Sequence, residues 1–308
     1  MSILKIEDVA YVRFAAPDLG AMRAFLEDFG MAVVEETPTR LVARGAGPSP
    51  VAHVTELGDA GFVGVAFRAE SPADLQRLAT AEGVSVEALE LPGGGSVVTL
   101  KDPDGHRVDV VAGQAPAEPR PVVKAQAWNS AGAHERLRAT KRIAAGAANV
   151  VRLGHVVLNV SNFRASEAWY KERLGLITSD EIRLSPEFAI GAFLRCDRGE
   201  QPTDHHTLFL MQGPKGPGFN HAAYEVADLD DLMRGHGRLK EAGRHAEWGV
   251  GRHILGSQVF DYWRDPWGHT LEHWTDGDLF TAADGSNIAT VQDLLGVQWG
   301  PPPPPTMG

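Results

Sequence analysis

The stretch Arg264-Asp-Pro-Trp-Gly-His-Thr-Leu-Glu272 decides the fold, because the same pattern occurs earlier in the chain at Lys101-Asp-Pro-Asp-Gly-His-Arg-Val-Asp109. In both stretches an Asp-Pro-x-Gly-His turn leads into a short apolar segment that is typical of a strand. Each segment ends on a carboxylate. The chain therefore repeats itself, and the two copies of this stretch lie 163 residues apart.

Two further pairs of stretches extend the repeat. Residues 9–19 correspond to 153–163 at an offset of 144 residues, and residues 61–67 correspond to 218–224 at an offset of 157 residues. The offsets grow along the chain, as expected if the second copy carries longer loops. A period this long indicates duplicated domains rather than a solenoid, whose units are much shorter.

Each copy is predicted to contain two similar modules of a strand, a helix and further strands. Helices are expected at 19–29 and 71–82 in the first copy, and at 165–173 and 229–242 in the second. The division of the chain that follows is an N-terminal domain at 1–114, a linker at 115–150, a C-terminal domain at 151–280 and an extended tail at 281–308.

Composition and charge narrow the class of protein. Of the 308 residues, 43% are hydrophobic and 22% charged, which suffices for two hydrophobic cores. The net charge of −11 argues against bulk attraction to nucleic acid or to an anionic membrane. No apolar run approaches membrane-spanning length, and the N-terminus lacks the layout of a signal peptide. Because the chain has one cysteine, Cys196, no intrachain disulfide can form. We therefore expect a cytoplasmic protein in which Cys196 is a buried packing residue.

Two segments invite other interpretations. The stretch 135–142 is basic enough to suggest an RNA or partner patch, but in an acidic chain a solvated linker face is the better prediction. The proline-rich end, 299–308, is predicted to be extended or disordered.

Three residues of the second copy carry groups that bind metals. His155, His221 and Glu272 each lie on an apolar, strand-like segment. Two imidazoles and one carboxylate on one face of a metal leave the opposite face open, which is how non-haem Fe(II) enzymes hold substrate and O2 side by side. A single strand histidine is more often a hydrogen-bonded core residue. The order, the strand contexts and the repeat together favour a metal site.

The first copy has lost this set of ligands. The residues that correspond to the three are Tyr11, Gly64 and Asp109, so one carboxylate remains and both imidazoles are gone. A single carboxylate cannot hold a divalent transition metal tightly. We therefore predict that the N-terminal copy is structural and that the C-terminal copy carries the site.

With these motifs the chain resembles the type I extradiol ring-cleaving dioxygenases of the vicinal oxygen chelate superfamily, which also includes glyoxalase I and the bleomycin and fosfomycin resistance proteins. The resemblance covers roughly residues 5–280. It implies an α+β fold of two tandem domains, each of paired βαβββ modules that form a curved mixed sheet around a funnel. It also implies that His155, His221 and Glu272 bind Fe(II), or alternatively Mn(II).

The activity implied by the resemblance is extradiol cleavage of a catecholic aromatic by O2, in the degradation of aromatic compounds. The expected partners are a small aromatic diol and O2, with no nucleic acid and no membrane, and we expect a homo-oligomer.

The resemblance also implies roles for residues around the metal. In Asp204-His-His-Thr-Leu-Phe209 the second histidine, His206, corresponds to the family's acid and base, and strand alternation is expected to point His205 away from the metal. His253 and Tyr262 correspond to a substrate-facing histidine and to a tyrosine that donates a hydrogen bond to a ligated oxygen. His269 and His273 flank Glu272 and are predicted to be structural or to stand behind the ligands.

The sequence departs from the family at one place. Leu255-Gly256 stands where several members carry an Asn-Asp pair, which puts a biphenyl-diol substrate in doubt. The ending 272–278 looks more like the branch that acts on 2,4,5-trihydroxytoluene. We predict a pocket for a single ring, crowded by three tryptophans of the closing strands: Trp263, Trp267 and Trp274.

Two other classes of function stay open. One is a glyoxalase-like isomerase or a thiol transferase of the same fold. Such enzymes generally build one site from both repeats, and Tyr11 and Gly64 argue against that arrangement. The other is a resistance protein that sequesters a ligand without metal, for which a complete His-His-Glu set is unnecessary. Metal content and O2 consumption with a catechol separate the three.

Overall fold

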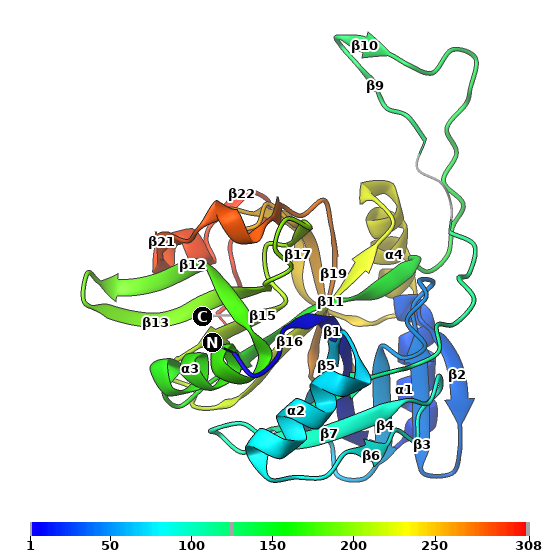
Figure 1. The fold of residues 1–308 in the computed structure, drawn as a ribbon. Coiled ribbons are helices and arrows are strands. Elements are labelled where there is room, and N and C mark those ends of the chain that lie inside the picture. Colours follow the sequence, from blue (N-terminus) through cyan, green and yellow to red (C-terminus); the bar gives the residue numbers. More distant parts are fainter. Residues whose placement is uncertain (1, 123–125, 306–308) are drawn as a thin grey trace.

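The computed structural model describes residues 2–122 and 126–305, which form two large sheets (Figure 1). The first sheet has eight strands in the order β2-β3-β4-β1-β5-β8-β7-β6. The bounds of its strands are β1 Ile6–Ala16, β2 Ala32–Glu36, β3 Arg40–Arg44, β4 His53–Leu57, β5 Gly61–Ala69, β6 Glu87–Ala88, β7 Ser96–Lys101 and β8 Arg107–Ala112.

The second sheet has ten strands in the order β21-β12-β13-β15-β11-β16-β19-β18-β17-β22. The bounds of these strands are β11 Val150–Asn159, β12 Leu176–Ser185, β13 Phe188–Cys196, β15 Leu208–Met211, β16 Gly218–Val226, β17 His245–His253, β18 Val259–Arg264, β19 Thr270–Thr275, β21 Asn287–Thr290 and β22 Val297–Trp299. Both sheets mix parallel and antiparallel pairs. The predicted α+β class is confirmed.

The helices lie where the sequence predicted them, within two residues. They are α1 (Leu19–Phe29), α2 (Pro72–Glu82), α3 (Phe163–Leu174) and α4 (Leu229–Glu241). Each begins after a residue whose side chain accepts a backbone N–H of the first turn: Asp18, Ser71, Asn162 and Asp228. The first three end at a glycine in the left-handed conformation, which a side chain would disfavour.

The two copies share their strand register as well as their pattern. In the first sheet Tyr11 pairs with Ala66, which pairs with Asp109 on the next strand. In the second sheet His155 pairs with Ala223, which pairs with Glu272. The repeat seen in the sequence is therefore a repeat in space.

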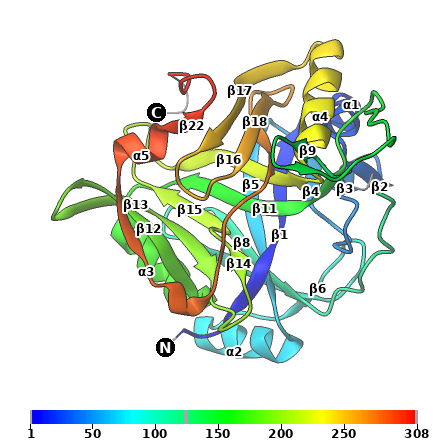
Figure 2. The ribbon, with the colours of Figure 1, turned by 90° about the horizontal axis from the view of Figure 1, so that it is seen from above.

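The two sheets pack together over a shared core. β1 lies beside β11 (Figure 2), and one cluster of buried side chains includes residues of both copies. The His273 Nε2–H donates to the carbonyl of Phe29 over 2.7 Å, and Arg244 binds the carboxylate of Asp28. His273 is thus structural, as predicted. Cys196 is buried in β13, and burial raises the pKa of its thiol, which confirms the predicted packing role.

The structure differs from the predicted extended tail at 281–308 over residues 281–305, and residues 306–308 lie outside the described residues. Residues 282–284 form a 3-10 turn, β21 pairs with β12 at one edge of the sheet, and β22 pairs with β17 at the other. Between them lies the short helix α5 (Val291–Leu295), which begins at a capping box formed by Thr290 and Asp293. Covering an exposed sheet edge satisfies its free backbone groups, which is the physical reason for the difference.

The linker carries an element of its own. Strands β9 (Asn129–Ser130) and β10 (Ala133–His134) pair as a hairpin that projects away from both sheets (Figure 1). Two further short strands, β14 (Thr203–Asp204) and β20 (Leu279–Phe280), pair with each other beside the second sheet. Among the described residues, no helix has the length and apolar character needed to cross a membrane.

Candidate metal centre

His155, His221 and Glu272 come from three adjacent strands, β11, β16 and β19, at the centre of the second sheet. The Nε2 atoms of the two histidines lie 3.4 Å and 3.3 Å from the same oxygen of Glu272. One ligand atom from each residue falls within 4.8 Å of the others. Strands that place alternate side chains on one face bring the three together, although the sequence separates them by up to 117 residues.

The three side chains fit a transition metal. All three are buried, and neither oxygen of Glu272 nor Nδ1 of His155 has a hydrogen-bond partner among the described residues. An unpaired polar atom in the interior is costly, so such atoms call for a ligand. Two imidazoles and a carboxylate suit a first-row divalent metal and leave coordination positions free.

A neighbouring amide orients one of the imidazoles. Nδ1 of His221 lies 2.9 Å from Oδ1 of Asn220, and because an amide oxygen only accepts, Nδ1 must carry the proton. The Nε2 of His221 is then free to bind a metal. This is the usual arrangement behind a metal-binding histidine, where a second hydrogen bond fixes the tautomer.

The charges at the centre suit metal binding. Burial by itself would raise the pKa of the Glu272 carboxyl, but the close approach of the His155 and His221 imidazoles outweighs it and holds that pKa well below its usual range. Burial lowers the pKa of His155, so its imidazole is neutral near pH 7. A carboxylate and neutral imidazoles are the forms that bind metals, so few protons must be displaced.

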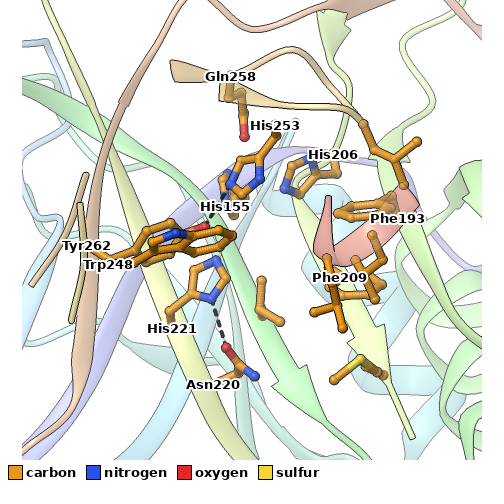
Figure 3. A pocket seen from close by; sticks show the side chains of 15 residues that line it. His155, Phe193, His206, Phe209, Asn220, His221, Trp248, His253, Gln258 and Tyr262 are labelled. Atoms are coloured by element: carbon orange, nitrogen blue, oxygen red, sulfur yellow. Dashed lines mark hydrogen bonds between the residues drawn. The ribbon is translucent and has the colours of Figure 1, made fainter. Parts of the chain in front are cut away.

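A pocket opens beside the three residues (Figure 3). His155 and His221 line it together with His206, His253 and Tyr262, whose side chains point toward one another in the close view. Its other walls are mostly apolar and come from β11, β13, β15, β17, the loop after β17 and α5: Val157, Phe193, Phe209, Met211, Trp248, Leu255, Leu294 and Leu295.

The three residues predicted to act beside the metal lie in this pocket. The rings of His206 and His155 are 4.0 Å apart between centroids. His253 Nε2 lies 2.9 Å from the hydroxyl of Tyr262 and 3.9 Å from Glu272. Burial lowers the pKa of His253 to about 4, and burial together with the neighbouring histidines lowers that of His206 well below its ordinary value. Both are neutral at pH 7, as a proton acceptor must be.

Comparison with known proteins agrees with this geometry. The model of the Glyoxalase/Bleomycin resistance protein/Dioxygenase superfamily matches residues 152–273, the segment that holds all three candidate ligands. This segment carries a domain of that superfamily. The resemblance inferred from the sequence motifs is confirmed at this level.

Known proteins match over most of the chain. Metapyrocatechase 2 of Cupriavidus necator is 29% identical over 97% of this chain and 90% of its own length. An iron-dependent extradiol dioxygenase of Rhodococcus jostii (strain RHA1) is 26% identical over 89% of this chain and 90% of its own. Among solved structures, the Mn(II)-bound glyoxalase of Novosphingobium aromaticivorans is 25% identical and superposes with a TM-score of 0.81, covering 99% of this chain and 94% of that one.

The N-terminal copy fills the corresponding position with protein groups. The carboxylate of Asp109 accepts hydrogen bonds from Tyr11 over 3.0 Å, from Thr99 over 2.8 Å and from Arg107 over 2.8 Å. Gly64 corresponds to His221 in the second copy. A side chain does not fit at Gly64, because a Cβ there would lie 2.4 Å from the carbonyl oxygen of Arg107. The remaining carboxylate is thus fully occupied within the protein.

One sequence argument about the pocket was wrong. Among the described residues, the pocket is not lined by Trp263, Trp267 or Trp274 but by Trp248, on a strand that the sequence did not predict. The Trp263 Nε1–H instead donates to Asp261 on the other face of β18, over 2.6 Å. Period-two alternation sends neighbouring side chains to opposite faces, and the tryptophan positions alone did not fix which face is which.

The departure at Leu255-Gly256 has a structural reason. Leu255 lines the pocket, while Gly256 has a φ of +77°, which favours glycine. A Cβ at Gly256 would also approach the ring of His205 to 3.0 Å. The position is small because a histidine ring packs against it.

Several residues of the pocket were missed by sequence reasoning. Asn220 directly precedes a candidate ligand, and that adjacency could have indicated a supporting role. Leu294 and Leu295 lie in the segment predicted to be an extended tail. The sequence around Trp248 did not predict a strand, because most of its neighbours in β17 are polar, charged or glycine.

Proposed function

We propose that this chain catalyses the extradiol cleavage of a catecholic aromatic by O2 at a non-haem Fe(II) centre, or alternatively a Mn(II) centre, held by His155, His221 and Glu272. The observation that carries the proposal is a buried set of two imidazoles and one carboxylate with unpaired ligand atoms, facing a pocket that also contains His206. The names of the relatives support it, since one is called a metapyrocatechase and another an iron-dependent extradiol dioxygenase.

The residues of the pocket have separate tasks in this proposal. When bound, the reduced metal supplies a shared coordination shell for the diol and O2 and a path for electrons from the ring to oxygen. His206 accepts the proton of a ring hydroxyl and later returns it. The hydroxyl of Tyr262, held by His253, donates a hydrogen bond to the diol. The apolar walls orient the ring and exclude water.

The site of ring cleavage tests the proposal. Supplied with Fe(II) under controlled O2, the protein should convert simple catechols and their alkyl derivatives to yellow ring-opened semialdehydes, with one O2 consumed per ring. Cleavage between the hydroxyls of every active catechol, giving muconates, would refute it. The His155→Ala variant should be inactive and serves as the control for adventitious iron.

A second candidate function rests on one comparison. The Novosphingobium structure with a TM-score of 0.81 is called a glyoxalase, so an isomerase or transferase remains the alternative. Against it stands the N-terminal copy, whose Asp109 is already bound by Tyr11, Thr99 and Arg107. Turnover of a thiol adduct of an α-ketoaldehyde without O2 consumption would favour the alternative.

The apolar walls favour a single ring with small substituents. Phe193 and Phe209 stack at 4.1 Å between centroids on one side of the pocket, and Leu294 and Leu295 of α5 lie beside them. We propose that substituted catechols or trihydroxytoluenes have a higher kcat/KM than two-ring diols. A clear preference for 2,3-dihydroxybiphenyl would overturn this assignment.

The cytoplasmic location of the protein stays a prediction. We also propose that the chain is a homo-oligomer. The β9–β10 hairpin supports the oligomer, because an isolated two-stranded hairpin is marginal in water. Trp128 and Leu137 flank the hairpin in the linker segment 126–142, here called the arm, and are 58% and 86% exposed. The arm carries Arg136, Arg138, Lys141 and Arg142 against the single carboxylate of Glu135, whereas the whole chain has a net charge of −11.

Light scattering coupled to gel filtration tests the oligomer. The wild-type chain should elute as an assembly, and the Trp128→Ser/Leu137→Ser variant should dissociate. Phe188→Ser, at an exposed position where β13 pairs with β12 in the second sheet, is the matched control. A wild-type monomer at micromolar concentration would refute the proposal.

A further inference from the structure

Three buried polar side chains form a line that runs from β12 to the pocket. Oδ2 of Asp180 lies 2.6 Å from Nε2 of His205, and Nδ1 of His205 lies 3.0 Å from Nδ1 of His206. Asp180, His205 and His206 are 6%, 1% and 3% exposed. His206 is the last member of the line, and its ring lines the pocket beside His155 (Figure 3).

We infer that Asp180 and His205 are positioning residues that fix the ring tautomer of His206, so that its unprotonated Nε2 faces the substrate. The inference rests on the proposed function, in which His206 accepts the proton of a ring hydroxyl. The inference gives His205 a role. The sequence predicted only that the His205 side chain points away from the metal.

The hydrogen-bonding capacity of each group leads to this tautomer. A carboxylate only accepts, so Nε2 of His205 must donate to Asp180. A neutral His205 then has a bare Nδ1, which can only accept, and Nδ1 of His206 must donate to it. A neutral His206 with its proton on Nδ1 has a bare Nε2. That nitrogen is the one left to face the pocket.

The same line serves the proton transfer. When Nε2 of His206 takes the proton of a ring hydroxyl, the ring becomes a cation whose Nδ1–H still donates to His205. The negative charge of Asp180, one imidazole further on, stabilises that cation. Giving the proton back to the substrate restores the starting arrangement, so no other proton donor is needed.

The surrounding structure holds the line in place. The Ser179 hydroxyl donates to the carbonyl of His205 over 2.6 Å, and buried Arg195 donates to Ser179 over 2.9 Å. The His205 ring packs against Gly256, where a Cβ would be only 3.0 Å from Nδ1. The bound backbone carbonyl and the packed ring together keep the short contacts to Asp180 and His206.

Two substitutions at Asp180 distinguish positioning from packing. In the Asp180→Asn rotamer that turns the amide N–H toward Nε2 of His205, the proton moves to the other nitrogen of each ring, so Nε2 of His206 is protonated. We expect kcat to fall roughly 100-fold or more, the range for a lost base, with little change in KM. In Asp180→Ala neither tautomer of His206 is imposed. A large share of the His206 rings then still has an unprotonated Nε2, so kcat should fall by no more than about tenfold.

A packing role predicts the reverse order, because asparagine has almost the shape of aspartate and alanine leaves a cavity. Slower turnover in Asp180→Ala than in Asp180→Asn would therefore overturn the inference. Metal content and melting temperature are measured on both variants, and His206→Phe gives the rate without the base.

The tautomer itself can be read without turnover. In the metal-free full-length chain with 15N-labelled histidine, long-range 1H–15N spectra separate protonated from unprotonated ring nitrogens, and the signals that vanish in His206→Phe belong to His206. We expect an unprotonated Nε2 in the wild type and a protonated one in Asp180→Asn. A protonated Nε2 in the wild type would refute the inference. A wild type that cleaves no catechol would refute the proposed function alone.

Discussion

Metal binding should stabilise the C-terminal sheet by an amount that one substitution removes. Because the unfolded chain cannot bring His155, His221 and Glu272 together, a metal binds only the folded protein. At a free metal concentration 100 times Kd, the stabilisation is about 2.7 kcal/mol. For a folding unit of this size each kcal/mol moves the midpoint by about 2–4 °C, so Tm should rise by roughly 5–10 °C.

The perturbation is His155→Ala, which removes one of the three ligands and leaves Glu272 and His221 in place. We expect the metal-induced rise in Tm to disappear and the metal content to fall from one per chain to a small fraction. The assay is anaerobic differential scanning calorimetry with and without Fe(II) or Mn(II), beside elemental analysis of dialysed protein.

The matched control is Tyr11→Phe, at the position of the N-terminal copy that corresponds to His155. It removes a hydrogen bond to Asp109 but no ligand, so the metal-induced rise in Tm should stay. The reasoning is refuted if His155→Ala keeps the full shift, or if the wild type binds two metals per chain.

Three further outcomes follow from the contacts described above. His206→Phe should keep its metal but lower kcat by about 10²–10⁴-fold. His205→Phe should lower kcat less. The opposite ranking in steady-state kinetics would show that His205, and not His206, faces the pocket. Burial lowers the pKa of His273 to about 4, below the ordinary 6.5, so the unfolded chain binds more protons between these values and stability falls as pH drops through that window. The His273 contribution is up to about 3 kcal/mol, and the urea midpoint of His273→Gln should change less between pH 7 and pH 5 than that of the wild type. In Gly154→Ala the new Cβ would lie 2.5 Å from Trp274, so we expect a loss of about 1–3 kcal/mol in chemical denaturation; an unchanged midpoint would show that the ring moves freely.

The sequence predicted the parts of the structure that depend on regular periods and on long-range repetition. Helix α1 spans the residues predicted for it, because an apolar stripe and a terminal glycine agree, and the structure adds Asp18 as the cap. Aligned motifs predicted that Tyr11 corresponds to His155 and that Asp109 corresponds to Glu272. The strand register of the two sheets shows the same correspondence.

The parts that were not predicted depend on tertiary contacts. Strand β17 contains polar and charged residues beside Trp248, so no alternation marks it as a strand in the sequence. Helix α5 spans five residues, too few to give a clear period, and it is stable only because β21 and β22 fix its ends to the two edges of the sheet. For the same reason the wall that Leu294 and Leu295 give to the pocket could not be inferred from the chain alone.

The two copies differ most in how the protein treats one buried carboxylate. Asp109 and Glu272 occupy the same place in the register, and both are almost completely buried. Asp109 receives hydrogen bonds from Tyr11, Thr99 and Arg107, so its charge is neutralised by the fold itself. Glu272 has no conventional hydrogen bond within the described residues and faces two imidazole nitrogens at 3.3–3.4 Å. A buried charge must be paired, and where the protein supplies no cation of its own, the pairing falls to a metal. The loss of one site and the retention of the other thus follow from the same electrostatic requirement, met in one copy by an arginine and in the other by a group that also has room for substrate.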